Sequence, residues 1–365
     1  MKKLLFITNY PAPYRVCFYD ELGKHADVTV LFSEKKEDRT HRDANWFITG
    51  EGRFRMVQLT QKRGALKGRD LCVDVIPWLK KSWDAIVVCG YSSPTNMLAM
   101  AWLKANRIPF YLEVDGGLIR EAKGIRYHIK RAMIGSPTWW ISSGRETTRY
   151  LTHYGAKEER IFHYPFTSLW AREIADSAPS PEEKQILRQK LGMEEKRILL
   201  FVGRLSAPKG MEDLLHVIPE LPEDTGVWFV GGEPNREHLD FCREHNLSRV
   251  HFVGFTKKDA LLDYYRAADY FVLPTWSDVW GLVINEAMAC GLPVVTTDRC
   301  VAGMELVRPG ENGFLVPARD RTALSQTLRL ALDADFRQLG ANALETIRPY
   351  TVENMAKAHM EIFDL

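Results

Sequence analysis

The chain has 365 residues, of which 45% are hydrophobic, and its formal net charge is +2. This length and apolar content predict a large core divided between two or more domains. No run reaches the roughly eighteen apolar residues of a membrane-spanning helix. We expect the start, "MKKLLFITNYPAPYR", to be a first strand and not a signal peptide.

Short apolar, β-branched runs alternate with longer helical patterns along the chain. They predict strands at 4–8, 27–32, 85–90, 109–114, 138–143, 198–203, 227–232, 250–255, 270–275 and 293–297. Continuous hydrophobic strands separated by helices are typical of parallel sheets that are covered on both faces. Two such sets in series predict an α/β chain with two doubly wound, Rossmann-like domains.

The boundary between these domains is expected within residues 163–185, where prolines interrupt the periodicity. We place the first domain at 1–165 and the second at 180–345. The segment "APSPEE" between them is interpreted as a linker, or as an exposed turn that leads into a helix.

The charge is unevenly distributed between the two parts of the chain. Residues 1–170 hold 27 Lys and Arg against 17 Asp and Glu, whereas the remainder holds 22 against 30. A basic first half and an acidic second half suggest domains with different tasks. The basic half suits an anionic membrane or an acidic acceptor, and an uneven solvated surface is the plainer alternative.

The cysteines are scattered and form no CxxC pair. Most stand in apolar contexts, so we expect reduced, buried thiols in a cytosolic protein, with neither a disulfide framework nor a zinc site. The six are Cys17, Cys72, Cys89, Cys242, Cys290 and Cys300.

Two cations follow the first predicted strand of the second half. In "LLFVGRLSAPKG", the strand ends at Gly203, and Arg204 and Lys209 come before an amphipathic helix that starts near Met211. Ligands of open α/β sheets bind at the carboxyl ends of the strands. An Arg fork and a Lys point charge there suit a pyrophosphate, although two solvated loop charges remain the alternative. No GxGxxG or Walker pattern is present.

The next two predicted strands end in glycines as well. The strand at 227–232 ends in the pair Gly231 and Gly232, and Gly254, Phe255 and Thr256 form the exit of the strand that starts at 250. Such exits let backbone groups meet the edge of a nucleotide base, but glycine after a strand is common in any α/β protein.

The stretch "SDVWGLVINEAMACGLPVV", residues 277–295, combines a strand exit with a helix. We expect the helix to begin near Gly281, so that the amides of Leu282 and Val283 offer a phosphate site. Glu286 lies about 7 Å further along the axis, roughly one phosphate-to-ribose step. Asp278 precedes the helix, where a donor sugar would lie. A core helix with one satisfied carboxylate is the alternative, but a buried, unpaired Glu is costly.

These motifs resemble glycosyltransferase family 4, the retaining GT-B enzymes. Asp278-x7-Glu286 is similar to their E-x7-E motif, and Arg204 with Lys209 is similar to their "GR" and downstream Lys. The segments "GGEP", "VGFT…DYYRAADYFVLPT" and "NGFLVPARD" match in order and spacing. The resemblance covers nearly all of the second half and is looser in the first.

The resemblance implies a GT-B fold, with two Rossmann-like domains facing each other across a cleft and a last helix, about 350–365, that crosses back to the first. Glu286 would bind the ribose, Arg204 and Lys209 the diphosphate, and Asp278 the hydroxyls of the donor sugar. Asp278 replaces the usual Glu, which leaves the donor sugar open.

A second departure from the family lies in "YLEVDGGLIR". Many members have a His at this strand end, whereas here the matching position holds Asp115. Asp115 is a candidate to contact the donor or to stabilise positive charge at the anomeric carbon. Glu113, two residues earlier, is predicted on the same face, in either a structural or a functional role.

The resemblance also implies transfer with retention, in which the leaving phosphate accepts the proton and no enzyme nucleophile is needed. Cationic groups and helix amides at the phosphate would then supply most of the stabilisation. We expect no cofactor besides the nucleotide-sugar substrate, whose base stays open, and no metal. The single DxD, Asp333-Ala334-Asp335, is interpreted as surface.

Basic and apolar residues are interleaved in residues 62–83 and 119–131 of the first half. The second stretch places Arg120, Lys123, Arg126, Lys130 and Arg131 around isoleucines and a tyrosine. Both stretches suit contact with anionic lipid at the inner face of the cytoplasmic membrane and a glycan or lipid-linked acceptor. A soluble acceptor stays open, and no nucleic-acid motif appears. Arg15 and "YSSPTN", residues 91–96, are expected on the acceptor side.

Two rival functions share this architecture. A nucleotide-sugar epimerase or hydrolase would act on the donor without an acceptor. A non-catalytic nucleotide-sugar binder is weakly suggested by Asp278, but Arg204, Lys209 and Glu286 argue against it.

Overall fold

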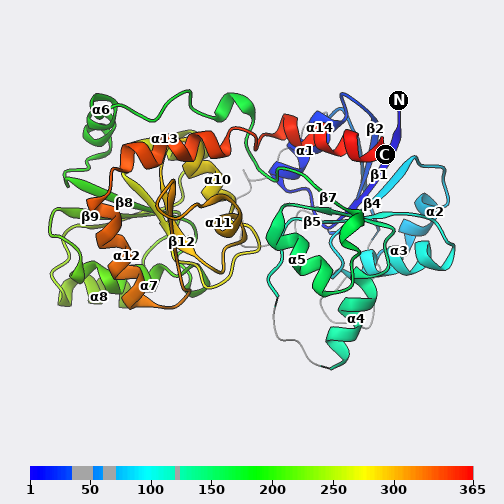
Figure 1. The fold of residues 1–365 in the computed structure, drawn as a ribbon, viewed down its shortest axis with the longest axis horizontal. Coiled ribbons are helices and arrows are strands. Elements are labelled where there is room, and N and C mark those ends of the chain that lie inside the picture. Colours follow the sequence, from blue (N-terminus) through cyan, green and yellow to red (C-terminus); the bar gives the residue numbers. More distant parts are fainter. Residues whose placement is uncertain (35–51, 61–70, 120–123, 365) are drawn as a thin grey trace. The chain divides into compact units, whose positions relative to one another are not determined.

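The computed structural model describes residues 1–34, 52–60, 71–119 and 124–364. It divides into two compact units. Unit 1 comprises Met1–Ser168 and Tyr350–Leu365, and unit 2 comprises Leu169–Pro349. Each unit is a parallel sheet with helices on both faces (Figure 1).

Unit 1 is built on a seven-stranded sheet in the order β3-β2-β1-β4-β5-β6-β7. Every neighbouring pair is parallel. The strands are β1 (Lys3–Thr8), β2 (Asp27–Phe32), β3 (Arg55–Gln58), β4 (Ala85–Cys89), β5 (Tyr111–Val114), β6 (Trp139–Ser142) and β7 (Ile161–His163). The five strands predicted in this half are all confirmed, and β5 lies near the centre of the sheet.

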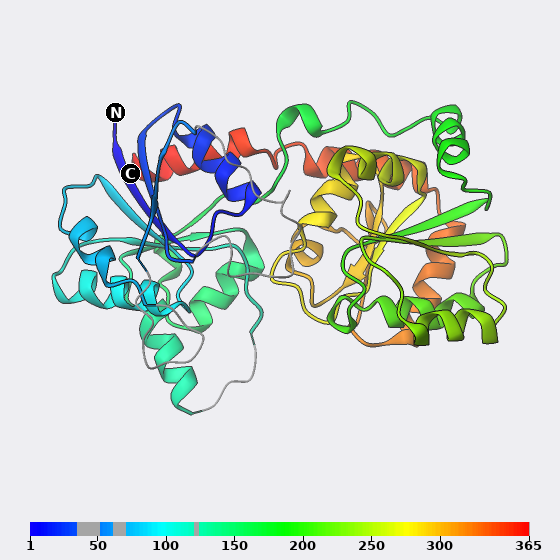
Figure 2. The same ribbon diagram turned by 180° about the vertical axis from the view of Figure 1, so that it is seen from behind.

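The helices of unit 1 lie in two layers (Figure 2). Their bounds are α1 (Pro13–Leu22), α2 (Ile76–Leu79), α3 (Pro94–Ala105), α4 (Ile125–Ile134), α5 (Arg145–His153) and α14 (Val352–Phe363). The last helix packs beside α1, with the His359 ring 4.6 Å from that of Phe18. Its residues therefore join the core of a unit whose first segment ends at Ser168, far earlier in the chain.

Unit 2 is built on a six-stranded parallel sheet in the order β10-β9-β8-β11-β12-β13. The strands are β8 (Arg197–Val202), β9 (Thr225–Val230), β10 (Val250–Val253), β11 (Tyr270–Leu273), β12 (Val294–Thr297) and β13 (Gly313–Val316). The order reverses between β8 and β11, so the loops after these two strands leave the sheet side by side.

The helices of unit 2 also cover both faces of its sheet (Figure 2). They are α6 (Pro181–Leu191), α7 (Met211–Val217), α8 (Arg236–Glu244), α9 (Lys258–Ala267), α10 (Leu282–Ala289), α11 (Val301–Leu306), α12 (Arg321–Asp333) and α13 (Phe336–Ile347). Ser180 and Glu183 form a capping box at the start of α6, so "APSPEE" leads into a helix as one of the two interpretations proposed.

Three strands were not predicted, and each lies at an edge of its sheet. β3, with the sequence RMVQ, is mostly exposed, and β7 has only three residues, none of them fully buried. β13 is half-buried. An edge strand needs no continuous apolar run, because one side has no neighbouring strand and its faces are less covered.

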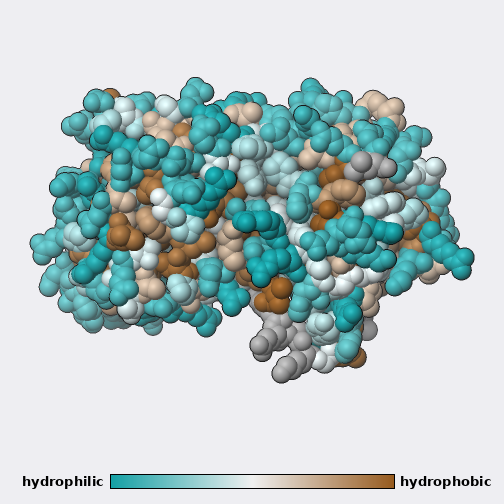
Figure 3. Space-filling view, viewed as in Figure 1, coloured by the Kyte–Doolittle hydropathy of each residue, from teal (hydrophilic) through white to brown (hydrophobic). Residues whose placement is uncertain are grey.

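The surfaces of both units are mainly hydrophilic, with scattered hydrophobic side chains, in the view of Figure 3. Within the described ranges, no helix has the length and apolar character needed to span a membrane. All six cysteines fall inside these ranges and are free thiols, three of them fully buried.

Candidate functional site

The loops after β8 and β11 are joined by hydrogen bonds at the carboxyl end of the unit 2 sheet. The backbone N–H of Trp276 donates to the carbonyl of Pro208 at 2.9 Å. The Thr275 hydroxyl donates to the same carbonyl at 2.8 Å. The loop that carries Lys209 is therefore held against the loop that carries Asp278, although the two residues are 69 positions apart.

Gly210 makes this close approach possible. It has φ +72°, and a Cβ built on it would lie 1.8 Å from the carbonyl oxygen of Pro274. The left-handed conformation disfavours other residues, and the backbone of Pro274 cannot yield as a flexible side chain does. Gly210 therefore allows the close approach of the two loops that positions Lys209.

We expect Gly210→Ala to destabilise unit 2 by more than about 1–2 kcal/mol, the cost of a left-handed conformation alone, and to weaken nucleotide binding. Gly192→Ala is a matched control, because Gly192 has φ +70° but a Cβ added to it would meet no atom within 4 Å. Chemical denaturation of both variants measures the difference. Equal losses in the two variants would show that the approach to Pro274 contributes nothing.

The predicted cation and the first predicted acid meet directly. Lys209 Nζ forms an ion pair with Asp278 Oδ2, and their side chains are 26% and 15% exposed. Asp278 is also held by its backbone, whose N–H donates to Arg299 O at 2.8 Å and whose carbonyl accepts from Val301 at 3.2 Å. Arg204 lies in the same loop as Lys209 and is exposed. This pairing of Lys209 with Asp278 was not predicted from the sequence.

The helix α10 starts where it was predicted. Gly281 is its N-cap with φ +103°, and as a glycine it supplies no side-chain cap to the first turn, which includes Leu282 and Val283. A Cβ on Gly281 would lie 2.8 Å from the Sγ of the buried Cys300. No acidic residue stands in this first turn, and the nearby Asp278 Oδ2 lies 3.7 Å from a Cβ built on Gly281.

Glu286 lies one turn into α10, about 6 Å along the axis from Leu282. It is half-buried, and its Oε2 accepts a hydrogen bond from the Tyr265 hydroxyl at 3.1 Å. Burial, and then the charge of Glu286, raises the pKa of Tyr265 well above its usual value, so the hydroxyl remains a donor. Tyr265 belongs to α9, so a second helix orients Glu286, the acid that is predicted to bind the ribose.

The two glycine-containing exits also lie at the carboxyl end of the sheet. Gly232 follows β9, and Gly254 with Phe255 follows β10. Phe255 is 61% exposed. All the predicted unit 2 residues thus lie at strand exits or on α10.

In unit 1, Asp115 directly follows β5 and pairs with Arg15. Its Oδ1 also accepts from the Tyr164 hydroxyl at 2.9 Å. Glu113 is fully buried and pairs with the same Arg15. Its Oε2 lies 3.5 Å from His359 Nε2. Sequence reasoning placed Arg15 near a sugar acceptor but missed its link to Glu113 and Asp115.

The surroundings of the two acids shift their pKa values in opposite directions. Burial alone would raise the pKa of Glu113, but Arg15 and His359 overcome it and lower that pKa to about 2. Burial and the nearby Glu113 charge raise the pKa of Asp115, against the effect of Arg15. Glu113 is therefore the firmly ionised partner of Arg15.

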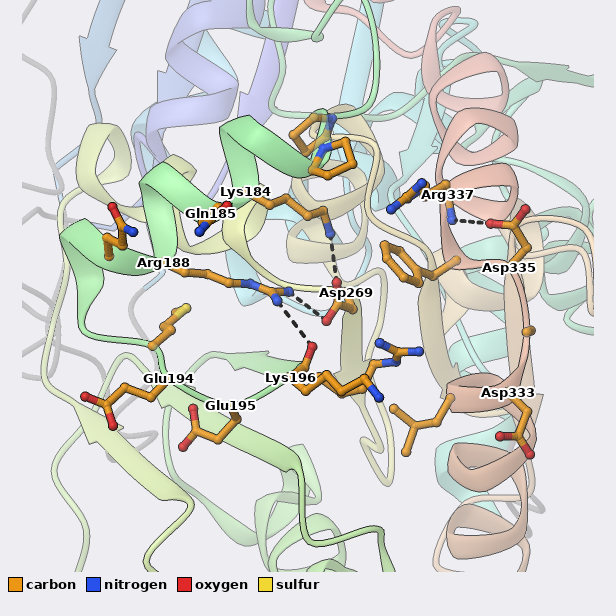
Figure 4. Close-up of a pocket in the computed structure, with 18 residues that line it drawn as sticks. Lys184, Gln185, Arg188, Glu194, Glu195, Lys196, Asp269, Asp333, Asp335 and Arg337 are labelled. Carbon is orange, nitrogen blue, oxygen red and sulfur yellow. Dashed lines mark hydrogen bonds and ion pairs between the residues drawn. The ribbon is translucent and has the colours of Figure 1, made fainter.

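One large pocket of unit 2 lies at the opposite, amino-terminal edge of its sheet. Figure 4 shows Lys184 and Arg188 of α6 pointing toward Asp269, which precedes β11. Arg188 donates to Asp269 at 2.7 Å, and the Ile198 amide donates to it at 2.9 Å. Asp269 is thus satisfied by protein groups, and we interpret this pocket as the anchor of α6. Asp335, of the DxD, caps α13 at its rim.

Part of the predicted basic surface lies outside the described residues, namely 62–70, Arg120 and Lys123. Of the remainder, Arg126 and Arg131 on α4 are exposed. Lys130 instead lies over aromatic rings, with Nζ 3.8 Å from the centre of Tyr154.

Comparison with known proteins finds a family that part of the second half resembles. Residues 196–334 match the sequence profile of the family described as glycosyl transferases group 1. Over these residues, the chain is similar to the glycosyl transferases group 1 family. The matched stretch contains β8 to α12, with Arg204, Lys209, Asp278 and Glu286.

Individual proteins are similar to this chain over more residues than the family profile. The chain is 30% identical over 237 residues to D-inositol 3-phosphate glycosyltransferase of Streptomyces bingchenggensis, covering 60% of this chain and 50% of that one. It spans about half the length of such curated relatives at 30% identity or more. It is 23% identical over 297 residues to the N,N'-diacetylbacillosaminyl-diphospho-undecaprenol alpha-1,3-N-acetylgalactosaminyltransferase of Campylobacter jejuni, covering 77% of both chains.

Among solved structures, the crystal structure of Anabaena Alr3699/HepE in complex with UDP matches with a TM-score of 0.76. The two share 19% identity, and the match covers 98% of both chains. This likeness concerns the fold alone, and it covers both halves of the chain. The predicted GT-B class of α/β fold is confirmed.

Proposed function

We propose that this protein is a glycosyltransferase that moves a sugar from a nucleotide-sugar donor to a glycan or lipid-linked acceptor, with retention at the anomeric carbon, in the synthesis of bacterial surface polysaccharide or glycolipid. The observation that carries the proposal is the convergence of Lys209, Asp278 and the start of α10 at Gly281, at the carboxyl end of the unit 2 sheet. Glu286 stands one turn beyond it.

In this proposal the donor lies along α10. Its diphosphate occupies the amides of Leu282 and Val283, together with Lys209 and Arg204, because both the helix dipole and the cations favour anions. Its ribose diol donates to Glu286, and its base lies near Gly232, Gly254 and Phe255. Lys209 must then contact the diphosphate as well as Asp278, its partner in the ion pair. Asp278 would lie beside the proposed position of the sugar.

The proposed chemistry needs neither a metal ion nor a further cofactor. Bond cleavage places negative charge on the leaving diphosphate, and preorganised cations and amides stabilise that charge without reorganisation. The leaving phosphate accepts the proton of the incoming hydroxyl group. Asp115 stands as the candidate side chain of unit 1 at the sugar.

The donor is tested by thermal unfolding with UDP, GDP, dTDP and their sugars. A ligand at one hundred times its Kd stabilises the folded state by about 2.7 kcal/mol, so one nucleotide should give a clear shift in Tm. The same shift should disappear in the Glu286→Leu variant. No shift with any of these nucleotides would contradict the proposal.

A hydrolase or epimerase of the same fold is the second candidate function. It would consume the nucleotide sugar at full rate without an acceptor, whereas the proposed transferase should release nucleoside diphosphate slowly until an acceptor is added. A non-catalytic binder would show the thermal shift and no turnover at all.

We further propose that unit 1 contacts anionic lipid through α4. This helix projects from the unit (Figure 1), and its exposed residues include Ile125, 76% exposed, and Ile129, 45% exposed. Arg126 and Arg131 stand beside them. Interleaved apolar and basic residues suit a bilayer interface, and the Campylobacter relative's name specifies a lipid-linked substrate.

The lipid proposal predicts co-sedimentation with anionic phosphatidylglycerol vesicles at low salt. Binding should fall in the variant Ile125→Asp/Arg126→Glu and at high salt, because the attraction is screened. Ile186→Asp on α6 is the matched control, since Ile186 is equally apolar and 65% exposed. Failure of the wild-type protein to bind these vesicles would contradict this part of the proposal.

A further inference from the structure

A buried ion cluster in unit 1 joins segments from both ends of the chain. Its members come from α1, the end of β5, the residue after β7 and α14. They are Arg15, Glu113, Asp115, Tyr164 and His359. Arg15 is at the centre, because its two terminal nitrogens bind two different carboxylates.

Glu113 and Asp115 differ in whether they keep a carboxylate oxygen that can accept a further hydrogen bond. Glu113 is 0% exposed, and both of its oxygens have partners: Oε1 pairs with Arg15, and Oε2 faces His359. The Asp115 side chain is 24% exposed. Its Oδ1 accepts from both Arg15 and Tyr164, whereas within the described ranges Oδ2 makes no hydrogen bond. Glu113 therefore neutralises Arg15, and Asp115 retains an oxygen that can accept further hydrogen bonds.

The location of this free oxygen is informative. Asp115 follows β5, an interior strand of a parallel sheet, and ligands of such sheets bind at the carboxyl ends of the strands. An ionised carboxylate only accepts hydrogen bonds, and hydroxyl groups are suitable donors. A carboxylate that is held on one oxygen and free on the other has a defined orientation toward such a donor.

We infer that Arg15 is a positioning residue, which together with Tyr164 fixes the Asp115 carboxylate as the acceptor for a hydroxyl group of a sugar substrate. This inference rests on the proposed glycosyl transfer. The hydroxyl belongs either to the transferred sugar or to the acceptor sugar, and the hydrogen bond is the same in both cases. Lysine cannot replace Arg15, because one ammonium group does not reproduce two donors in a rigid fork.

The test compares Asp115→Asn, Arg15→Lys and the double variant, using the nucleotide sugar that gives the thermal shift and an undecaprenyl-diphosphate-linked sugar as acceptor probe. Asp115→Asn should lower kcat/KM by about 10- to 150-fold, the usual range for a hydrogen bond to a charged group. Arg15→Lys should lower it nearly as much. The double variant should be no worse than Asp115→Asn, because both changes remove the same contact.

Two further variants separate positioning from general stability. Tyr164→Phe removes only the hydroxyl that donates to Asp115 at 2.9 Å and, more weakly, to Glu113 at 3.4 Å. It should lower kcat/KM by several-fold even if Arg15→Lys folds poorly. Arg188→Lys is the matched control, because it alters a buried Arg–Asp pair in unit 2, at the sheet edge opposite the proposed site. Its kcat/KM should equal that of the wild type.

The source of the hydroxyl follows from which constant changes. If it belongs to the transferred sugar, Asp115→Asn weakens binding of the nucleotide sugar but not of the free nucleoside diphosphate. If it belongs to the acceptor, the acceptor KM rises and donor binding is unchanged. Losses that multiply in the double variant would overturn the positioning role of Arg15. A wild-type protein that binds no nucleoside diphosphate would instead overturn the proposed function.

Discussion

Lys209→Ala is expected to lower kcat by about 10²- to 10³-fold, the usual cost of removing one preorganised group that stabilises charge developing in a transition state. In the proposed mechanism this charge forms on the leaving diphosphate. The effect should also appear in binding, because without Lys209 the partly buried Asp278 carboxylate would repel the diphosphate. Turnover of the identified nucleotide sugar and calorimetry with its nucleoside diphosphate measure the two effects.

The double variant Lys209→Ala/Asp278→Asn separates these contributions. Removing both charges should restore part of the affinity for nucleoside diphosphate, whereas kcat should remain low. Lys190→Ala is the control, since Lys190 is 65% exposed and pairs with Asp263 on the surface of unit 2. Unchanged turnover of Lys209→Ala would rule out its role at the phosphate.

Glu113→Gln is expected to destabilise unit 1 by about 3–5 kcal/mol at neutral pH, the usual cost of breaking a buried ion pair by removing one partner. Glu113 is completely buried, and its charge offsets Arg15. Hydrogen exchange of the β5 and α14 amides reports on this unit alone, because both elements belong to it.

The pH dependence of this effect has a defined sign. The pKa of Glu113 is lowered from 4.5 to about 2 in the folded protein. Its contribution is therefore fully present above about pH 4.5 and is lost as the pH falls toward 2. The difference between the wild type and Glu113→Gln should narrow over this window, and a constant difference would contradict the ionised state.

Glu146→Gln is the control for this prediction. Glu146 lies on α5 of the same unit and pairs with Arg149 at 2.9 Å, but Arg149 is 71% exposed. Exposed pairs contribute only about 0.2–1 kcal/mol, because water screens them. The variant should therefore leave exchange at β5 and α14 almost unchanged.

Local sequence patterns were sufficient to predict the interior strands of both sheets. Interior strands of a parallel sheet are apolar on both faces, so runs such as 198–203 and 270–275 predict strands that the structure contains as β8 and β11. The start of α10 was also predictable, because Gly281 and the glycine after Cys290 mark its ends. The edge strands β3 and β7 were missed, because their residues are incompletely buried and include polar side chains, and the short apolar strand β13 was missed as well.

The candidate site also combines features that the sequence predicted with features that only the structure shows. The amino-acid sequence by itself determined which residues follow each strand, and hence that Arg204, Lys209, Asp278 and Glu286 gather at one edge of a sheet. Only the tertiary structure decided their partners: Asp278 for Lys209, Tyr265 for Glu286, and the contact of Gly210 with Pro274.

The ion cluster of unit 1 shows the reason most clearly. Arg15 and Glu113 are 98 positions apart, and His359 comes from the last helix of the chain. Hydrophobic periodicity reports only which face of a local element is buried, whereas a buried charge must find its partner wherever the folded chain brings one. The strand order and the packing of α14 on α1 bring these residues together, and no local pattern encodes either.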